Sequence, residues 1–182
     1  MDQHFIIFDT ETTGLPGPDA TPLAKQPQII EYAGIKVNWA TLEELDRLTF
    51  FANPGVPLPA KITEITGLTD ADLKDEPPFV ANYPALVDFH LGTRGLCAHN
   101  LAFDCSLLRF ELMRLDAQCR FPWSPENVCT VEASKSIKGH RLHLSDIHTM
   151  ATGAPHKGAH RAMVDTEALL NVVVWMREQG LL

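Results

Sequence analysis

The sequence predicts a mixed α/β fold, in which strands come first and helices alternate with strands later in the chain. Short apolar runs typical of buried strands stand at residues 5–8, 29–37 and 49–52. Two more short runs, at 95–98 and 127–130, are separated by a helical pattern. Acidic residues follow strands and begin helices, and open α/β sheets usually place their sites at strand ends. We therefore expect a sheet covered by helices, with a functional site at one end of its strands.

Length and composition indicate an ordinary soluble protein. The chain has 182 residues, which is most simply one domain covering residues 1–182. No apolar run approaches the ~20 residues of a membrane span, and acidic residues at positions 9 and 11 come too early for a signal peptide. The four cysteines show no C-x-x-C spacing. We expect reduced thiols and a cytoplasmic location, without a membrane partner.

The first three apolar runs are expected to form neighbouring strands. The run at 5–8 leads into Asp9 and Glu11, and a Thr-Thr-Gly turn signal follows. About ten residues connect the runs at 29–37 and 49–52. A connection of that length suits an antiparallel hairpin better than a helical crossover.

Helices are predicted by apolar residues at spacings of three and four and by Gly or Pro at the ends of the segments. The predicted helices cover residues 59–67, 78–91, 101–115, 142–150 and 161–178. Near the start of the last predicted helix, His160 and Asp165 are five positions apart, which would be about 140° around a helix. We therefore expect His160 on the preceding loop or first turn and Asp165 on the helix behind it.

Asp9 and Glu11 are the most informative acidic pair. Residues i and i+2 of a strand face the same side, about 6–7 Å apart. A buried strand that brings two carboxylates together meets like-charge repulsion unless a positive partner is present. Mg²⁺ and similar hard cations prefer carboxylate oxygens as ligands. The pair alone is also compatible with solvated residues at a strand end.

Charge is unevenly distributed along the chain. The net charge is −8, but residues 135–161 hold five Lys or Arg and one acidic residue, so this segment is +4 and the remainder is −12. Five of the eight histidines also lie in this segment. A positive segment in an acidic chain can meet a polyanion, although an ordinary solvated loop explains the same pattern equally well.

Three blocks of residues resemble the exonuclease motifs of the DnaQ-like family. They are Asp9-x-Glu11 after a strand, Asp104 in the block His99-Asn-x-x-Phe-Asp104, and His160-x-x-x-x-Asp165 at the start of the final helix. Their order and spacing resemble the DEDDh branch of 3′→5′ exonucleases, which includes the epsilon subunit of DNA polymerase III, the exonuclease domain of Gram-positive polymerase C, and RNase T. The resemblance extends from residue 5 to about residue 175.

The resemblance implies a ribonuclease-H-like fold, with a five-stranded mixed sheet flanked by helices, and a site for two divalent metal ions, Mg²⁺ or Mn²⁺. Asp9 would bridge both ions, Glu11 and Asp165 would complete one, and Asp104 would support the other. Two such ions can stabilise the attacking and the leaving oxygen of an in-line displacement on phosphorus. His160 would act as the general base, because imidazole readily exchanges a proton near neutral pH.

The substrate residues implied by the resemblance follow the first and second motifs. Thr12, Gly14 and Leu15 are expected to line the site of the 3′-terminal nucleotide, with Leu15 packing on a base. His99 and Asn100 are expected near the substrate.

The expected function is hydrolysis of single-stranded DNA ends to nucleoside 5′-monophosphates, in proofreading or repair. RNA ends are the alternative substrate, since discrimination rests on contacts to the 2′-OH that the motifs do not reveal. A DNA polymerase is a candidate partner, and a monomer and a homodimer are both compatible with the sequence. A non-catalytic nucleic-acid-binding module and a phosphatase with an aspartyl nucleophile are competing interpretations. The second acid, Glu11, is unlike the Asp expected at that position in the phosphatase.

Overall fold

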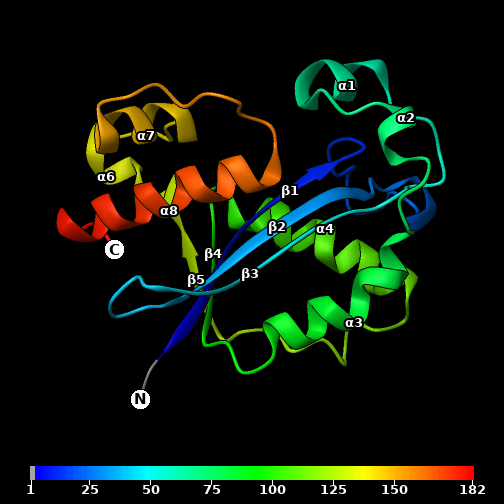
Figure 1. Cartoon of the computed structure of the whole chain (residues 1–182), viewed down its shortest axis with the longest axis horizontal. Coiled ribbons are helices and arrows are strands. Elements are labelled where there is room, and N and C mark those ends of the chain that lie inside the picture. The colour runs from blue at the N-terminus through cyan, green and yellow to red at the C-terminus, as the bar shows by residue number, and fades with distance from the viewer. Residues whose placement is uncertain (1–2) are drawn as a thin grey trace.

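A five-stranded mixed sheet flanked by helices forms the centre of the protein (Figure 1). The computed structural model describes residues 3–182. The sheet has the order β3-β2-β1-β4-β5, with the strands β1 His4–Thr12, β2 Ile29–Asn38, β3 Glu44–Phe51, β4 Gly95–Ala98 and β5 Glu126–Cys129. β2 is antiparallel to both β1 and β3, whereas β4 is parallel to both β1 and β5. The predicted mixed α/β architecture and the three adjacent N-terminal strands are confirmed.

Eight α-helices are present in the described part of the chain, together with a 3-10 turn at Leu23–Lys25. They are α1 Ala60–Thr66, α2 Asp70–Leu73, α3 Phe79–His90, α4 Leu101–Arg114, α5 Thr130–Ala133, α6 Lys135–Lys138, α7 Leu144–Thr152 and α8 Ala162–Glu178. The five helices predicted from the sequence correspond to α1, α3, α4, α7 and α8. Among residues 3–182, no helix has the length and apolar character needed to cross a membrane.

The side chains of β1 alternate between two apolar layers, as the twofold period of a strand requires. Ile6 and Phe8 belong to the cluster formed with α3 and α4, whereas Phe5 and Ile7 pack with residues of α8. Because the alternation continues along the strand, Asp9 and Glu11 share the side of α8, and Thr10 shares the side of α4. The alternation along β1 therefore places the Asp9 and Glu11 carboxylates on the same side of the sheet, the side of α8.

Two strands extend by several residues beyond the runs predicted from the sequence. The strand predicted at 49–52 begins at Glu44, so the hairpin connection comprises only residues 39–43. This strand lies at the edge of the sheet and its first four residues are exposed, so they do not produce a buried apolar pattern. β1 likewise continues past residue 8 to Thr12, because its backbone stays paired with β2 beyond the apolar run.

We predict that Gly95→Ala destabilises the fold, because β4 approaches β1 closely at this position. Gly95 pairs with Phe5, and a methyl group on Gly95 would lie 2.0 Å from the Phe5 ring. The ring is held on its other side by Trp39, at 4.1 Å between ring centroids. Overpacking of this kind costs about 1–3 kcal/mol of unfolding free energy, measurable by urea denaturation. Gly14→Ala is the matched control, since a methyl group there meets no atom within 4 Å. Equal urea midpoints for the two variants would contradict the prediction.

Candidate active site

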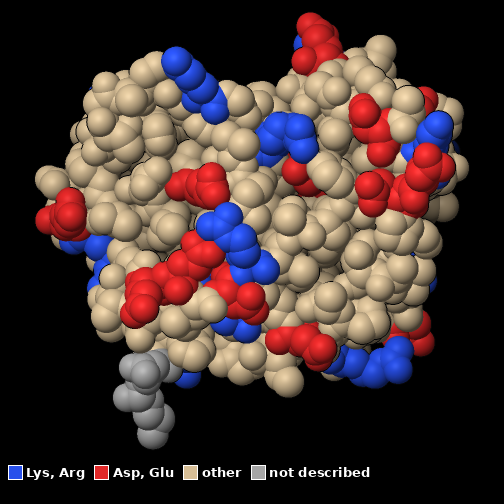
Figure 2. Space-filling view, viewed as in Figure 1, with Lys and Arg blue, Asp and Glu red and all other residues tan. Residues whose placement is uncertain are grey.

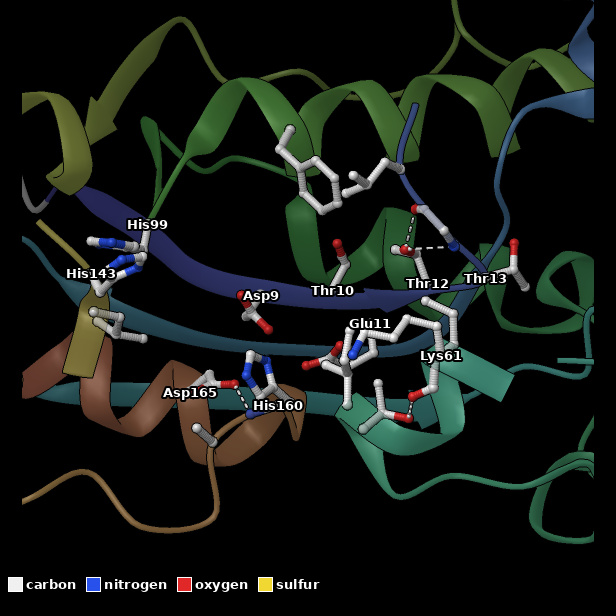
Figure 3. A pocket seen from close by; sticks show the side chains of 18 of the residues that line it. Asp9, Thr10, Glu11, Thr12, Thr13, Lys61, His99, His143, His160 and Asp165 are labelled. Atoms are coloured by element: carbon white, nitrogen blue, oxygen red, sulfur yellow. Dashed lines mark hydrogen bonds between the residues drawn. The ribbon is translucent and has the colours of Figure 1, made fainter. Parts of the chain in front are cut away.

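A pocket of about 870 Å³ lies at the end of β1, between α1, the start of α7 and the start of α8. Asp9 and Glu11 of β1 form part of its lining, together with Asp165 and His160 (Figure 3). These four side chains come from segments about 150 residues apart in the sequence, and they point toward one another. The structure therefore brings together the first and third motifs in one open pocket.

The closest group of possible metal ligands comprises Glu11, His160 and Asp165. Their ligand atoms all lie within 4.8 Å of one another. Asp165 stands in the first turn of α8, and His160 stands on the loop immediately before it. His160 adopts a positive φ of 68°, and its backbone N–H donates a hydrogen bond to Asp165 Oδ2 at 2.7 Å. The loop position expected for His160 is thus the one observed.

Asp104 is placed on the other side of β1. It lies in the first turn of α4 and is only 3% exposed. Its Oδ1 accepts a hydrogen bond of 2.7 Å from Thr10 Oγ1. Thr10 lines the pocket, whereas Asp104 lies behind it. Asp104 is therefore connected to the pocket through the Thr10 hydroxyl, a contact that motif spacing did not indicate.

Burial and mutual repulsion raise the pKa of the central carboxylates. Burial is the main cause for Asp9, whose pKa is raised well above its usual value, and Asp104 and Glu11 add like charge. The pKa of Glu11 is raised to about 8, by burial first and then by Asp165 and Glu31. The pKa of Asp104 rises to about 7 because of burial, although the Thr10 hydrogen bond opposes the shift. The cluster concentrates more negative charge than the protein groups around it balance.

Glu31 is an additional buried carboxylate next to this cluster. It is 3% exposed and pairs in register with Glu11 on the neighbouring strand. Arg161 Nε lies 3.1 Å from Glu31 Oε2 and ties the residue after His160 to β2. In the sequence, Glu31 stands out only as an acidic residue inside an apolar strand run. Its proximity to Glu11 depends on the register between β1 and β2.

One wall of the pocket carries the residues expected at the terminal nucleotide. Thr12, Gly14 and Leu15 all line it. The Thr12 hydroxyl donates to the Gly14 carbonyl at 2.7 Å, which folds this turn against the end of β1. Leu15 is 82% exposed, so its apolar side chain is available to a ligand. Further apolar lining comes from Ile62 and Ile65 of α1 and from Phe103 of α4.

His99 and Asn100 have different positions. His99 lines the pocket, but its two ring nitrogens already contact Thr130 Oγ1 at 2.9 Å and the Leu142 carbonyl oxygen at 3.1 Å. Asn100 precedes α4 in a left-handed conformation with φ of 101° and lies outside the pocket lining. His99 thus joins the end of β4 to the start of α5 and to the segment before α7. A substrate contact by Asn100 stays a prediction.

The basic segment at residues 135–161 is partly neutralised within the protein. Lys135 and Arg141 both form ion pairs with Glu132. In the face shown by Figure 2, Lys and Arg are interspersed with Asp and Glu. The segment instead contributes histidines to the pocket, namely His143, His156 and His160.

The residues present fit a hard divalent cation. Asp9, Glu11 and Asp165 present carboxylate oxygens to the pocket, and burial together with mutual repulsion raises the pKa of Asp9 and of Glu11. Carboxylate oxygens are the preferred ligands of Mg²⁺ and related ions. A bound cation would reverse these pKa shifts, as an opposite charge within a few ångströms does.

We predict that the metal-free protein loses stability as the pH rises from about 4.5 to about 8, the range between the usual and the raised pKa of Glu11. Glu11, with a pKa of about 8, and Asp104, with a pKa of about 7, bind protons in the folded state that they release when unfolded. Their stabilising contribution is complete below their usual pKa values and disappears as the pH passes the raised values. The measurement is the thermal midpoint in chelator. Glu11→Gln should flatten the profile, and a midpoint that rises over this range would contradict the prediction.

Comparison with known proteins agrees with the three motifs. Residues 6–173 match the model of a family described as Exonuclease. The PolC-type DNA polymerase III of Oceanobacillus iheyensis is 34% identical over 186 residues, covering 99% of this chain and 12% of that protein. A DNA polymerase III subunit epsilon-like protein of Rhodobacter capsulatus is 28% identical over 189 residues, covering 97% of this chain and 25% of that protein. The chain therefore spans only a small part of these curated relatives.

Solved structures share the fold. The nuclease domain of 3′hExo, a DEDDh family member bound to rAMP, superposes with a TM-score of 0.77 at 17% identity, covering 98% of this chain and 94% of that one. Exonuclease X in complex with 5′ overhanging duplex DNA gives a TM-score of 0.65 at 20% identity, covering 97% and 93% of the two chains. These matches confirm the ribonuclease-H-like exonuclease fold. Together with the family match and the motifs, they show that the chain belongs to the DnaQ-like exonuclease family.

Proposed function

We propose that the protein is a metal-dependent 3′→5′ exonuclease that releases nucleoside 5′-monophosphates from single-stranded DNA ends. The observation that carries this proposal is the convergence of Asp9, Glu11, Asp165 and His160 in one open pocket. The fold holds these carboxylates close together, and such an arrangement suits a site that binds cations. Membership of the exonuclease family supports the reaction class.

The carboxylates would hold two divalent ions, Mg²⁺ or Mn²⁺. Asp9, whose pKa is raised by Asp104, Glu11 and Asp165, is the candidate ligand to both ions. Glu11 and Asp165 would complete the site of one ion. Asp104 would act through Thr10 or through water, because it lies behind the pocket lining. When bound, two such ions would stabilise the negative charge on the attacking and leaving oxygens of the phosphate.

His160 is the candidate general base. It is exposed, lies on the loop before α8 and has its side chain in the acidic cluster. An imidazole at this position can accept a proton from an attacking water and release it to solvent. The hydrogen bond from its backbone to Asp165 holds the loop while leaving the ring nitrogens available for that exchange.

The pocket dimensions and its apolar wall favour a chain end with unpaired bases. A volume of about 870 Å³ suits a terminal nucleotide with its phosphate rather than a length of duplex. Leu15, Ile62 and Phe103 offer apolar surface on which bases freed from pairing can pack. The turn at Thr12–Gly14 closes the wall next to Glu11, where we place the terminal sugar.

Single-stranded DNA is the preferred candidate substrate because the PolC-type and epsilon-like relatives are DNA polymerase III proteins by name. On the same basis we propose that residues 1–182 form one exonuclease domain, with a DNA polymerase as candidate partner. RNA ends are the second candidate substrate, and the assay below compares the two.

We predict that the protein degrades unblocked single-stranded DNA to mononucleotides only when Mg²⁺ or Mn²⁺ is present. The assay uses DNA and RNA of equal sequence, each with a free or a blocked 3′ end, with metal or with chelator. A blocked 3′ end should prevent release, because hydrolysis begins at that end. Asp9→Ala, which removes the central carboxylate, is the inactive reference. Release from blocked ends, or equal activity of a folded Asp9→Ala variant, would contradict the proposal.

We predict that His160→Ala slows hydrolysis by about 10²–10⁴-fold, the usual effect of losing a general base. The metal-binding carboxylates remain, so Mn²⁺ should still bind and shift the thermal midpoint. His140→Ala is the matched control, because His140 is an exposed histidine of the same segment that contacts only the Lys138 carbonyl. A rate near that of the wild type at neutral pH would remove His160 from this role.

A further inference from the structure

Asp165 has a second histidine partner in addition to the His160 backbone. His156 Nε2 lies 2.5 Å from Asp165 Oδ1, and the His156 side chain is only 4% exposed. A carboxylate accepts hydrogen bonds and cannot donate them, so the His156 Nε2 must carry the hydrogen. Both oxygens of Asp165 are thereby held, one by His156 and the other by the N–H of His160.

His156 is itself fixed by its surroundings. Its ring packs against the ring of His148 on α7, with 5.3 Å between the centroids. Because the His156 side chain is buried and packed against His148, its ring is restrained beside Asp165. The contact therefore runs from α7 through His156 to the first turn of α8, at the point where the acidic cluster begins.

The same contact secures the loop that carries His160. The loop leaves α7 at Gly153 and enters α8 after Arg161. Asp165 binds it at His156 and again at His160, so that the loop is closed over one carboxylate. Loss of either contact would allow the Asp165 side chain to change its orientation and the loop to move.

We infer that His156 is a positioning residue that holds the Asp165 carboxylate and the His160 loop in place for metal binding and hydrolysis. This inference rests on the proposed function. Each carboxylate oxygen has two lone pairs, so Oδ1 can accept the His156 hydrogen and still face a cation. Partners of this kind orient ligand carboxylates, and their removal typically lowers metal affinity or activity by about 10–100-fold.

The test compares Mn²⁺ binding by calorimetry in wild type, His156→Leu and His156→Gln. The leucine side chain removes the donor, whereas the glutamine amide can place an N–H where Nε2 stands. We expect about 10–100-fold weaker Mn²⁺ binding for His156→Leu and affinity close to that of wild type for His156→Gln. His140→Leu, at an exposed histidine of the same basic segment, should bind as wild type does. Equal Mn²⁺ affinity of wild type and folded His156→Leu would overturn the inference.

A second readout does not depend on metal or activity. Hydrogen exchange of residues 153–161 in chelator should become faster in His156→Leu, including the His160 amide that donates to Asp165. Unchanged exchange would overturn the inference even if the protein is an active nuclease. Absence of Mn²⁺ binding in the wild type would instead overturn the proposed function. If His156→Leu does not fold, His156→Asn replaces it, because its shorter amide does not reach the Nε2 position, and equal affinities of the Asn and Gln variants would overturn the inference.

Discussion

The structure depends on the burial of like charges at the end of its central strand. Asp9 lies near four further carboxylates, each of which raises its pKa in addition to burial: Asp104, Glu11, Asp165 and Glu31. Inside a folded protein such repulsion reduces stability unless protons, cations or hydrogen-bond donors offset it. Two protein cations lie near this cluster. Arg161 pairs with Glu31 and lowers the pKa of Glu11 only in part. Lys61 lines the pocket and pairs with Glu64. The fold therefore concentrates negative charge that is only partly balanced at the end of β1, beside the open pocket.

The sheet topology explains how this deficit is assembled. β1 is central, with antiparallel β2 on one side and parallel β4 on the other. Parallel pairing brings the end of β4, and with it the start of α4, to the end of β1 where Asp9 stands. α8 covers the opposite face and supplies Asp165. Thr10 connects the two faces, because its hydroxyl reaches Asp104 while its neighbours in the strand face α8.

The sequence was sufficient where a residue's role depends on local pattern. Apolar runs located β1 and β4, helical spacing located α4 and α8, and the His160–Asp165 spacing placed His160 on a loop. It was insufficient where the role depends on partners distant in the chain. The edge strand β3 lacks a buried pattern in its first half, and the short helices α5 and α6 have few apolar positions. Thr10, Glu31 and His156 became recognisable only through strand register and the path of the loop before α8.

An acidic protein can act on a polyanion only if its site presents positive charge locally. With a net charge of −8 and mixed charges on the face of Figure 2, the surface as a whole does not attract nucleic acid. The carboxylate cluster resolves this difficulty, because bound cations would be held in the pocket and not elsewhere. The apolar residues of the facing wall, such as Leu15 and Ile62, add contacts that do not depend on charge. Under the proposed function, the pocket would recognise a terminal nucleotide whose base can pack on these residues and whose phosphate can reach the cations. Both conditions are met by an unpaired chain end.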